Sequence, residues 1–195
     1  SVTGWFVMAL KSGEMAGLAP APAAYQVVGR FLDGVFVSPE QGYGYQINSH
    51  NRGFKLRPAL TAEGLLCRQY LGSPRDAPEL TAGTALLLDS VTIDFGSNES
   101  PAWEKDIYAW YYITQVCHHL GGRPWQRWNA QLQSRVPAAQ KSTGPEKGSW
   151  DPAYDQWGDV GGRLYATCLC TCMLEVYYRH LPLYGELPPA SPPVT

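Results

Sequence analysis

The chain has 195 residues, a length typical of one domain or of one part of a larger domain. Its contents of 45% hydrophobic and 16% charged residues are ordinary for a globular protein. A net charge of −2 gives no electrostatic reason to expect binding to nucleic acid, and no apolar run is long enough to cross a bilayer.

The five cysteines do not match a secreted disulfide framework, because their number is odd and three of them crowd into residues 168–172. Buried thiols behave as small hydrophobic residues, so we expect a reducing, cytoplasmic environment. The sequence begins at Ser1 within what resembles the start of a helix, without an initiator methionine or a signal peptide. We therefore expect it to be part of a longer protein.

Hydrophobic periodicity predicts four helices in the first half of the chain. They span residues 5–18, 23–32, 62–71 and 78–89. Thr61 is the expected N-cap of the third helix, and Pro78 the expected first residue of the fourth. The intervening segments 38–53 and 95–101 are rich in Gly, Asn, Tyr or Pro and are predicted loops.

Three more helices are expected in the second half. Asp106 begins one that Gly121 and Gly122 end, and residues 125–140 form the next, with a kink or an end at Pro137. After a loop over 141–162, residues 163–180 are apolar or small on nearly every side. A helix of this kind is buried, so we expect it at the centre of the fold.

Helix stops at Gly17, Gly72 and Gly121 recur at a spacing of roughly 50 residues, a period typical of repeated supersecondary units. Mostly apolar helices alternate with more amphipathic ones. The pattern predicts an all-α fold with two concentric layers of helices, an α/α toroid built of helical hairpins. The domain is expected to span residues 1–182, and the proline-rich residues 183–195 are an expected flexible tail.

The chain resembles the toroidal terpenoid cyclases and protein prenyltransferases, and bacterial squalene-cyclase-like proteins in particular. Squalene cyclases repeat a Gln-and-Trp motif that joins an outer helix to the next inner one. The residues that resemble one copy are Leu132, Gln140, Gly148 and Trp150, and residues 41–43 resemble a degenerate second copy. The resemblance covers essentially the whole chain and implies the C-terminal half of a longer barrel, completed by the same chain or by a partner.

The catalytic motifs of these families are not evident. Prenyltransferases hold zinc with Asp, Cys and His, and the comparable positions here are Asp106, Tyr108 and Ala166, so we expect neither a metal nor another cofactor. Squalene cyclases protonate their substrate from an Asp-x-Asp-Asp motif that this chain lacks. Asp106 is expected to cap its helix, and a catalytic role for it is the alternative.

Aromatic and polar side chains in the second half are candidates for lining a ligand cavity. Aromatic faces stabilise carbocations, although the same rings also fill the space between two helical layers. The loop before the last helix adds acidic residues that ordinary turn chemistry also explains. The candidates are Trp110, Tyr111, Trp150, Asp151, Asp155, Trp157, Arg163 and Tyr165.

Two cysteine-containing groups are weighed as metal ligands. Cys117 precedes two histidines, and Cys168 and Cys172 share one helix face. Packing is the expected role of both groups, because neither has a convincing partner pair of ligands.

Two functional hypotheses follow. The first is a non-catalytic binding or scaffold module of a larger protein, whose partner is a hydrophobic, isoprenoid-like ligand or another protein. The second is an isoprenoid cyclase whose general acid lies upstream of Ser1. Resemblance of the fold cannot choose between them, because function depends on the site.

Overall fold

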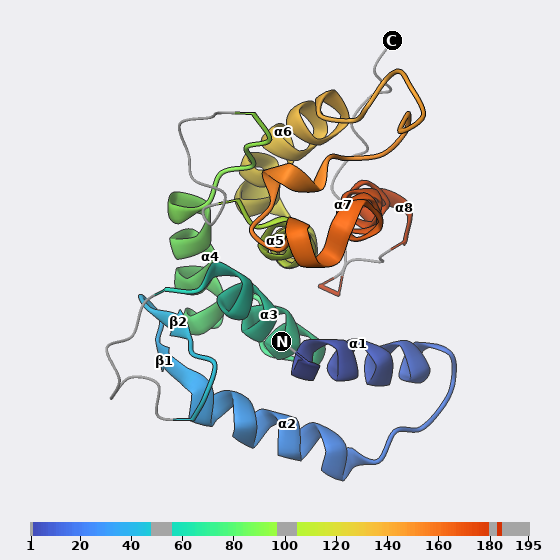
Figure 1. The fold of residues 1–195 in the computed structure, drawn as a ribbon. Coiled ribbons are helices and arrows are strands. Elements are labelled where there is room, and N and C mark those ends of the chain that lie inside the picture. The colour runs from blue at the N-terminus through green and yellow to red at the C-terminus, as the bar shows by residue number, and fades with distance from the viewer. Residues whose placement is uncertain (1, 48–55, 97–104, 180–182, 185–195) are drawn as a thin grey trace.

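The computed structural model describes residues 2–47, 56–96, 105–179 and 183–184. Within them the chain forms eight α-helices and a short β-hairpin, which confirms the predicted all-α class (Figure 1). The elements in chain order are α1 (Val2–Met15), α2 (Pro22–Val35), β1 (Phe36–Ser38), β2 (Gly42–Tyr43), α3 (Pro58–Tyr70), α4 (Pro78–Ser90), α5 (Ile107–Leu120), α6 (Gly122–Ala138), the 3₁₀ turn η3 (Pro152–Tyr154), α7 (Gly158–Leu174) and α8 (Val176–Arg179).

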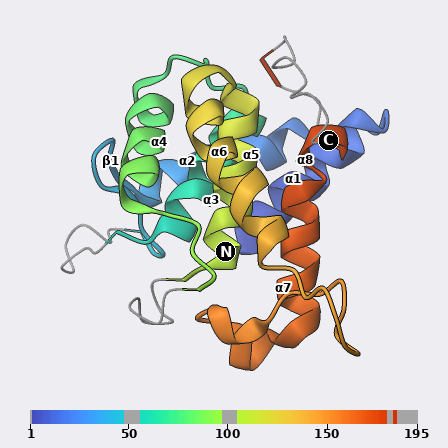
Figure 2. The same cartoon turned by 90° about the horizontal axis from the view of Figure 1, so that it is seen from above.

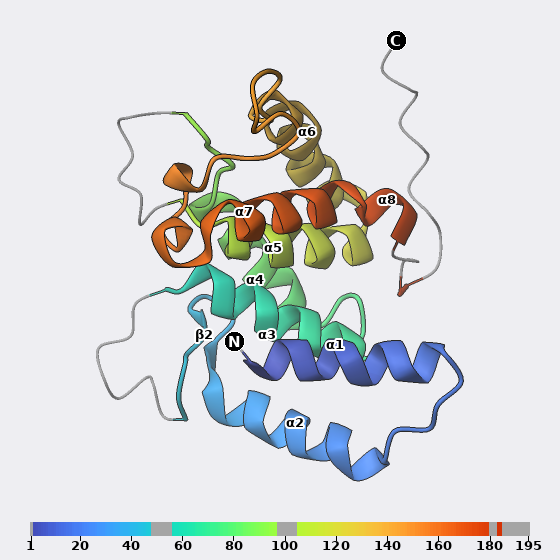
Figure 3. The same ribbon diagram turned by 45° about the vertical axis from the view of Figure 1, so that its right-hand side comes forward.

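The helices pack in two layers. In the first layer α1, α3, α5 and α7 lie side by side in that order, each against the next (Figure 3). In the second layer α2 packs on α1, α4 on α3 and α5, and α6 on α5 and α7. Between consecutive helices from α1 to α7 the chain therefore passes from one layer to the other. None of the helices in the described part of the chain is long and apolar enough to cross a membrane.

The central helix is α5, where every residue except Tyr108 is buried. The prediction that residues 163–180 form the buried centre is wrong. Leu164 is 77% and Tyr178 is 93% exposed, and Cys168 is also exposed. The reason is position: α7 ends the first layer and has α5 and α6 on one side only (Figure 2). A backbone break at Gly162, whose φ is 68°, lies just before the predicted helix and interrupts α7, which begins earlier, at Gly158.

Several helix ends agree with the sequence and others do not. Gly17, Gly72 and Gly121 take positive φ angles just after α1, α3 and α5, which confirms the predicted stops. Helix α4 begins at Pro78 as expected. Pro137 lies inside the last turn of α6, which ends at Ala138.

The predicted N-cap Thr61 is wrong, because α3 begins one turn earlier, with Pro58 in its first turn and Arg57 as N-cap. Thr61 Oγ1 instead accepts a hydrogen bond from Tyr43 N at 3.2 Å. The predicted loop 38–53 contains β2, paired antiparallel with β1. Residues 48–53 and 97–101 of the predicted loops, and 185–195 of the predicted tail, lie outside the described residues.

A buried tryptophan joins α6 to α7. Trp150 Nε1 donates to Val136 O at 2.7 Å, and Trp150 N donates to Thr167 Oγ1 at 3.3 Å. In the same connection Gln140 Nε2 donates to Gly148 O at 2.9 Å. The glutamine, glycine and tryptophan singled out in the sequence therefore meet in one small structure.

A buried tyrosine joins α2 to α3 in a similar way. Tyr43 N donates to Thr61 Oγ1, as Trp150 N does to a threonine of α7, and the Tyr43 hydroxyl accepts from Arg68 Nε at 3.1 Å. A glycine of positive φ precedes the aromatic residue in both connections, Gly42 and Gly148. We call these two connections the aromatic joints.

Gly64→Ala should disrupt the first joint. A Cβ at Gly64 would lie 2.6 Å from a ring carbon of Tyr43, so the ring and α3 must move apart. We expect the free energy of unfolding to fall by about 1–3 kcal/mol, measured by urea denaturation. Gly29→Ala in α2 is the control, because its Cβ would meet Leu71 at 3.6 Å and alanine favours a helix. Equal stabilities of the two variants would contradict this account of the joint.

Candidate functional site

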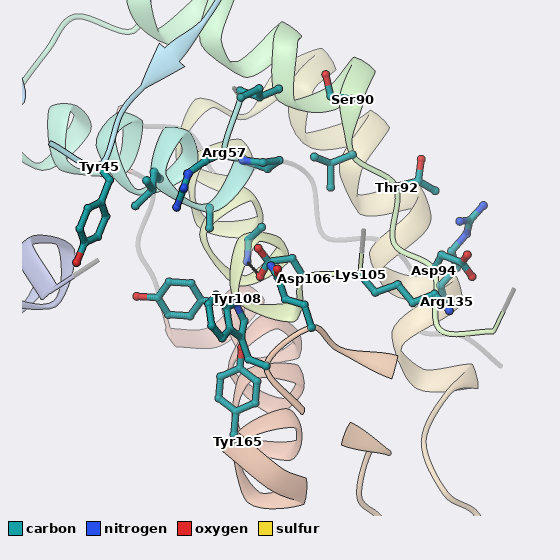
Figure 4. Close-up of a pocket in the computed structure, with 18 residues that line it drawn as sticks. Tyr45, Arg57, Ser90, Thr92, Asp94, Lys105, Asp106, Tyr108, Arg135 and Tyr165 are labelled. Carbon is teal, nitrogen blue, oxygen red and sulfur yellow. Dashed lines mark hydrogen bonds between the residues drawn. The ribbon is translucent and has the colours of Figure 1, made fainter. Parts of the chain in front are cut away.

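A cavity of about 1410 Å³ lies at the N-terminal ends of α3, α5 and α7 (Figure 4). Because these helices run in the same direction in adjacent positions, their first turns come together at one end of the layer (Figure 3). The lining segments are 45, 56–60, 90–92, 94, 105–106, 108–109, 135, 156–157 and 165.

The lining is apolar and aromatic on one side and charged on another. Tyr45, Tyr108 and Tyr165 lie toward one side in Figure 4, and Lys105 and Arg135 lie toward the other. Aliphatic side chains of α3 and the end of α4 complete the apolar wall, among them Leu56, Leu60 and Val91. The lining therefore combines broad apolar faces with several charged groups.

Asp106 lines this cavity and caps α5, which confirms its expected capping role. Its Oδ1 accepts a hydrogen bond from Ala109 N at 2.9 Å. The first amides of a helix have no partner within it, and a carboxylate also complements the positive end of the helix dipole. Local sequence explains this contact completely.

Asp155 reaches the same helix end from the segment before α7. Its Oδ2 accepts from Ile107 N at 2.6 Å and its Oδ1 from Trp157 N at 2.8 Å. Gln156 N adds a hydrogen bond to Lys105 O at 2.9 Å. Asp106 and Asp155, which we call the carboxylate pair, thus satisfy two amides of one helical turn, and Asp155 is only 5% exposed.

Burial and mutual repulsion favour a proton on the carboxylate pair. Burial raises the pKa of Asp106 from 3.8 to about 6, and the charge of Asp155 acts in the same direction, against the hydrogen bond from Ala109 N. Burial also raises the pKa of Asp155. The pKa of the Tyr165 hydroxyl is raised by burial and then by the charges of both carboxylates. The pair therefore titrates closer to neutrality than ordinary carboxyl groups.

Of the residues that the sequence suggested as lining a ligand cavity, Trp157 and Tyr165 line this one. Trp110 is fully buried and contacts Phe95 edge-on, with ring centroids 5.1 Å apart, so it lies in the core. Tyr111 stacks on Trp5 of α1 at 5.9 Å, outside the cavity lining. Trp150 belongs to the second aromatic joint.

Arg163 and Asp151 fasten the connection before α7. Arg163 Nη2 lies 3.0 Å from Glu146 Oε1 and 3.7 Å from Asp151 Oδ2, and Asp151 also pairs with Lys141 at 3.4 Å. Arg163 Nη1 donates to Trp150 O at 3.2 Å. These two candidates hold the second aromatic joint in place and lie outside the cavity lining.

Sequence reasoning missed several residues of the cavity, namely Tyr45, Arg57, Lys105, Tyr108 and Arg135. Three of them lie at the start of a first-layer helix. The alternation of helices between two layers could have indicated these residues. Helices of the same layer then run in the same direction, so their N-terminal ends must lie at one edge.

The groups weighed as metal ligands lie elsewhere. Cys117 and the two histidines after it are buried at the C-terminal end of α5, and burial raises the pKa of the Cys117 thiol. In the described part of the chain no three His, Cys, Asp or Glu side chains come together in a way that could hold a metal ion.

No protein-family model, curated protein or solved structure matches this chain. A function for this chain is therefore inferred from the cavity, from the carboxylate pair and from the resemblance noted in the sequence.

Asp106→Asn should stabilise the protein in a pH-dependent way. The folded state binds the Asp106 proton more tightly than the unfolded state, so wild-type stability falls as pH rises from about 4 to about 6. Asparagine also caps helices and stays neutral. We expect its free energy of unfolding to exceed that of the wild type by about 1–3 kcal/mol at pH 8 and to converge with it near pH 4.

Asp151→Asn is the control for chemical denaturation at these two pH values. The hydrogen bond from Ala153 N and the neighbouring Lys141 and Arg163 lower the pKa of Asp151, so removal of its charge should not stabilise the protein at pH 8. A wild-type-like pH profile for Asp106→Asn would contradict the burial of the pair.

Proposed function

We propose that this chain is a toroid-like binding module that holds an apolar, isoprenoid-like ligand in the cavity at the N-terminal ends of α3, α5 and α7. The observation that carries the proposal is the cavity itself, whose volume of about 1410 Å³ exceeds the range usual for drug-sized ligands. Its tyrosines and Trp157 offer broad apolar faces to such a molecule.

The aromatic joints support the toroid part of the proposal. Each joins a second-layer helix to the next first-layer helix, which is where the Gln-and-Trp motif of squalene cyclases lies. In both, the amide of a buried aromatic residue binds a threonine hydroxyl of the helix that follows. Because the two connections share this contact, we infer that they descend from one repeated unit.

The two edges of the first layer support a larger assembly. On α1 the side chains of Val2 and Phe6 are exposed, and on α7 those of Val160 and Leu164 are exposed. Apolar helix edges of this kind are typical of surfaces that other helices cover. We propose that the remainder of a ring, from the same polypeptide or from a partner, covers them.

Ala59→Trp tests the binding function by filling the cavity. Ala59 lies in the first turn of α3 and lines the cavity, so an indole there would occupy ligand volume. We expect the affinity for farnesol, measured by calorimetry, to fall by about tenfold or more.

Ala130→Trp is the matched control, because Ala130 is exposed on α6 and is not among the cavity residues. Its affinity should equal that of the wild type. Equal loss in both variants, or no binding by the wild type, would contradict the proposal.

A second candidate function is acid-catalysed cyclisation of an isoprenoid. The raised pKa of Asp106 favours it, because a carboxylic acid that keeps its proton near pH 6 can act as a general acid beside aromatic rings that stabilise cations. In this candidate Asp106 protonates one double bond of the bound polyene, and a second double bond attacks the resulting carbocation to close a ring. The ring cation then loses a proton to the Asp106 carboxylate or to water, which gives a neutral cyclic alkene and restores the acid.

Product analysis separates the two functions. If Asp106 is the general acid, the Asp106→Asn variant should form no cyclised product from squalene but should still bind farnesol. A binding module yields no product with either protein.

A further inference from the structure

We propose that the carboxylate pair makes ligand binding in this cavity proton-dependent, so that an uncharged apolar ligand binds more tightly as the pH falls. The inference rests on the proposed binding function and adds a means of regulating it. It concerns the affinity of the site and requires no chemical reaction.

The geometry places the pair where its charge matters to a ligand. Asp106 lines the cavity, and Asp155 accepts from the amide of the next residue, Ile107, so both carboxylates contact the first turn of α5. One ionised carboxylate and one neutral acid would also satisfy the helix end, because a protonated carboxyl keeps an oxygen that accepts from an amide. One proton can therefore be gained without loss of either cap.

Other charged and titratable groups line the same cavity or lie beside Asp106. They come from α3, the segment after α4, the segment before α5, α5 itself, α6, the segment before α7 and α7. They are Arg57, Asp94, Lys105, Tyr108, Arg135, Asp155 and Tyr165.

Among the described lining residues, Asp106 is a carboxyl group whose pKa burial raises into the range near neutrality. Arginine and lysine remain charged between pH 5 and pH 8, and tyrosine remains neutral there. Burial raises the pKa of Tyr108 further from that range. Asp94 accepts from Gly96 N at 3.0 Å in an exposed turn, and no histidine belongs to the lining.

The consequence follows from the removal of water. An apolar ligand that enters the cavity displaces water from Asp106, and an ionised carboxylate loses far more by this than a neutral acid does. Binding is therefore coupled to uptake of a proton, and by linkage the ligand raises the pKa of the pair. If only the protonated form binds, the affinity falls about tenfold for each pH unit above the pKa.

Calorimetry with farnesol between pH 5 and pH 8 tests the inference. The wild type should bind at least about tenfold more weakly at pH 8 than at pH 5. Repeating the titration in buffers of different ionisation enthalpy should show uptake of protons on binding. Circular dichroism at each pH establishes that the protein remains folded.

Variants of the pair make the test specific. Asp106→Asn should bind farnesol tightly with little pH dependence, whereas Asp151→Asn should keep the wild-type profile. Asp155→Asn provides a second test if Asp106→Asn folds poorly. Loss of the neighbouring charge lowers the pKa of Asp106, so its binding should weaken at a lower pH than in the wild type.

The outcomes separate this inference from the proposed function. Tight wild-type binding that does not change between pH 5 and pH 8 would overturn the proton dependence and leave the binding function intact. Absence of farnesol binding by the wild type and by Asp106→Asn at every pH would overturn both.

Discussion

The constraint on which this structure depends is the burial of α5. A central helix cannot satisfy the amides of its first turn with water, so the protein must supply acceptors for them. It does so with two carboxylates from different segments, Asp106 beside the helix and Asp155 from the connection before α7. The second contact ties α7 to α5 and brings Trp157 and Tyr165 to the cavity. The helix cap and the candidate site are therefore one arrangement.

This arrangement carries an electrostatic disadvantage. The buried Asp155 and the half-buried Asp106 repel each other at one helix end, and neutral caps such as asparagine or serine would satisfy the same amides. Groups whose pKa values are shifted by burial and by a specific neighbour gather at functional sites, although structural networks shift them as well. Here the shifted group faces a large cavity with aromatic walls, which is why we propose that Asp106 acts in ligand binding as well as in capping α5.

Local patterns predicted much of this fold, and tertiary packing decided the rest. The cap at Asp106, the start of α4 at Pro78 and the glycine stops follow from short-range chemistry. Composition could not tell α5 from α7, because both are apolar and only the neighbours of each helix decide which is central. The contact of Asp155 with Ile107, 48 residues away, likewise depends on how the layers pack. The cavity could not be predicted for the same reason, because its walls come from five helices or their flanking segments.

The most direct test of this account is a carbon-13 NMR titration of the aspartate side-chain carboxyls, with Asp106 assigned from the Asp106→Asn spectrum. The account requires a pKa of about 6 for Asp106, well above that of Asp151 in the same spectra. An Asp106 carboxyl that titrates near 3.8, as an exposed aspartate does, would mean that the first turn of α5 is open to water. The carboxylate pair and the site built around it would then be refuted.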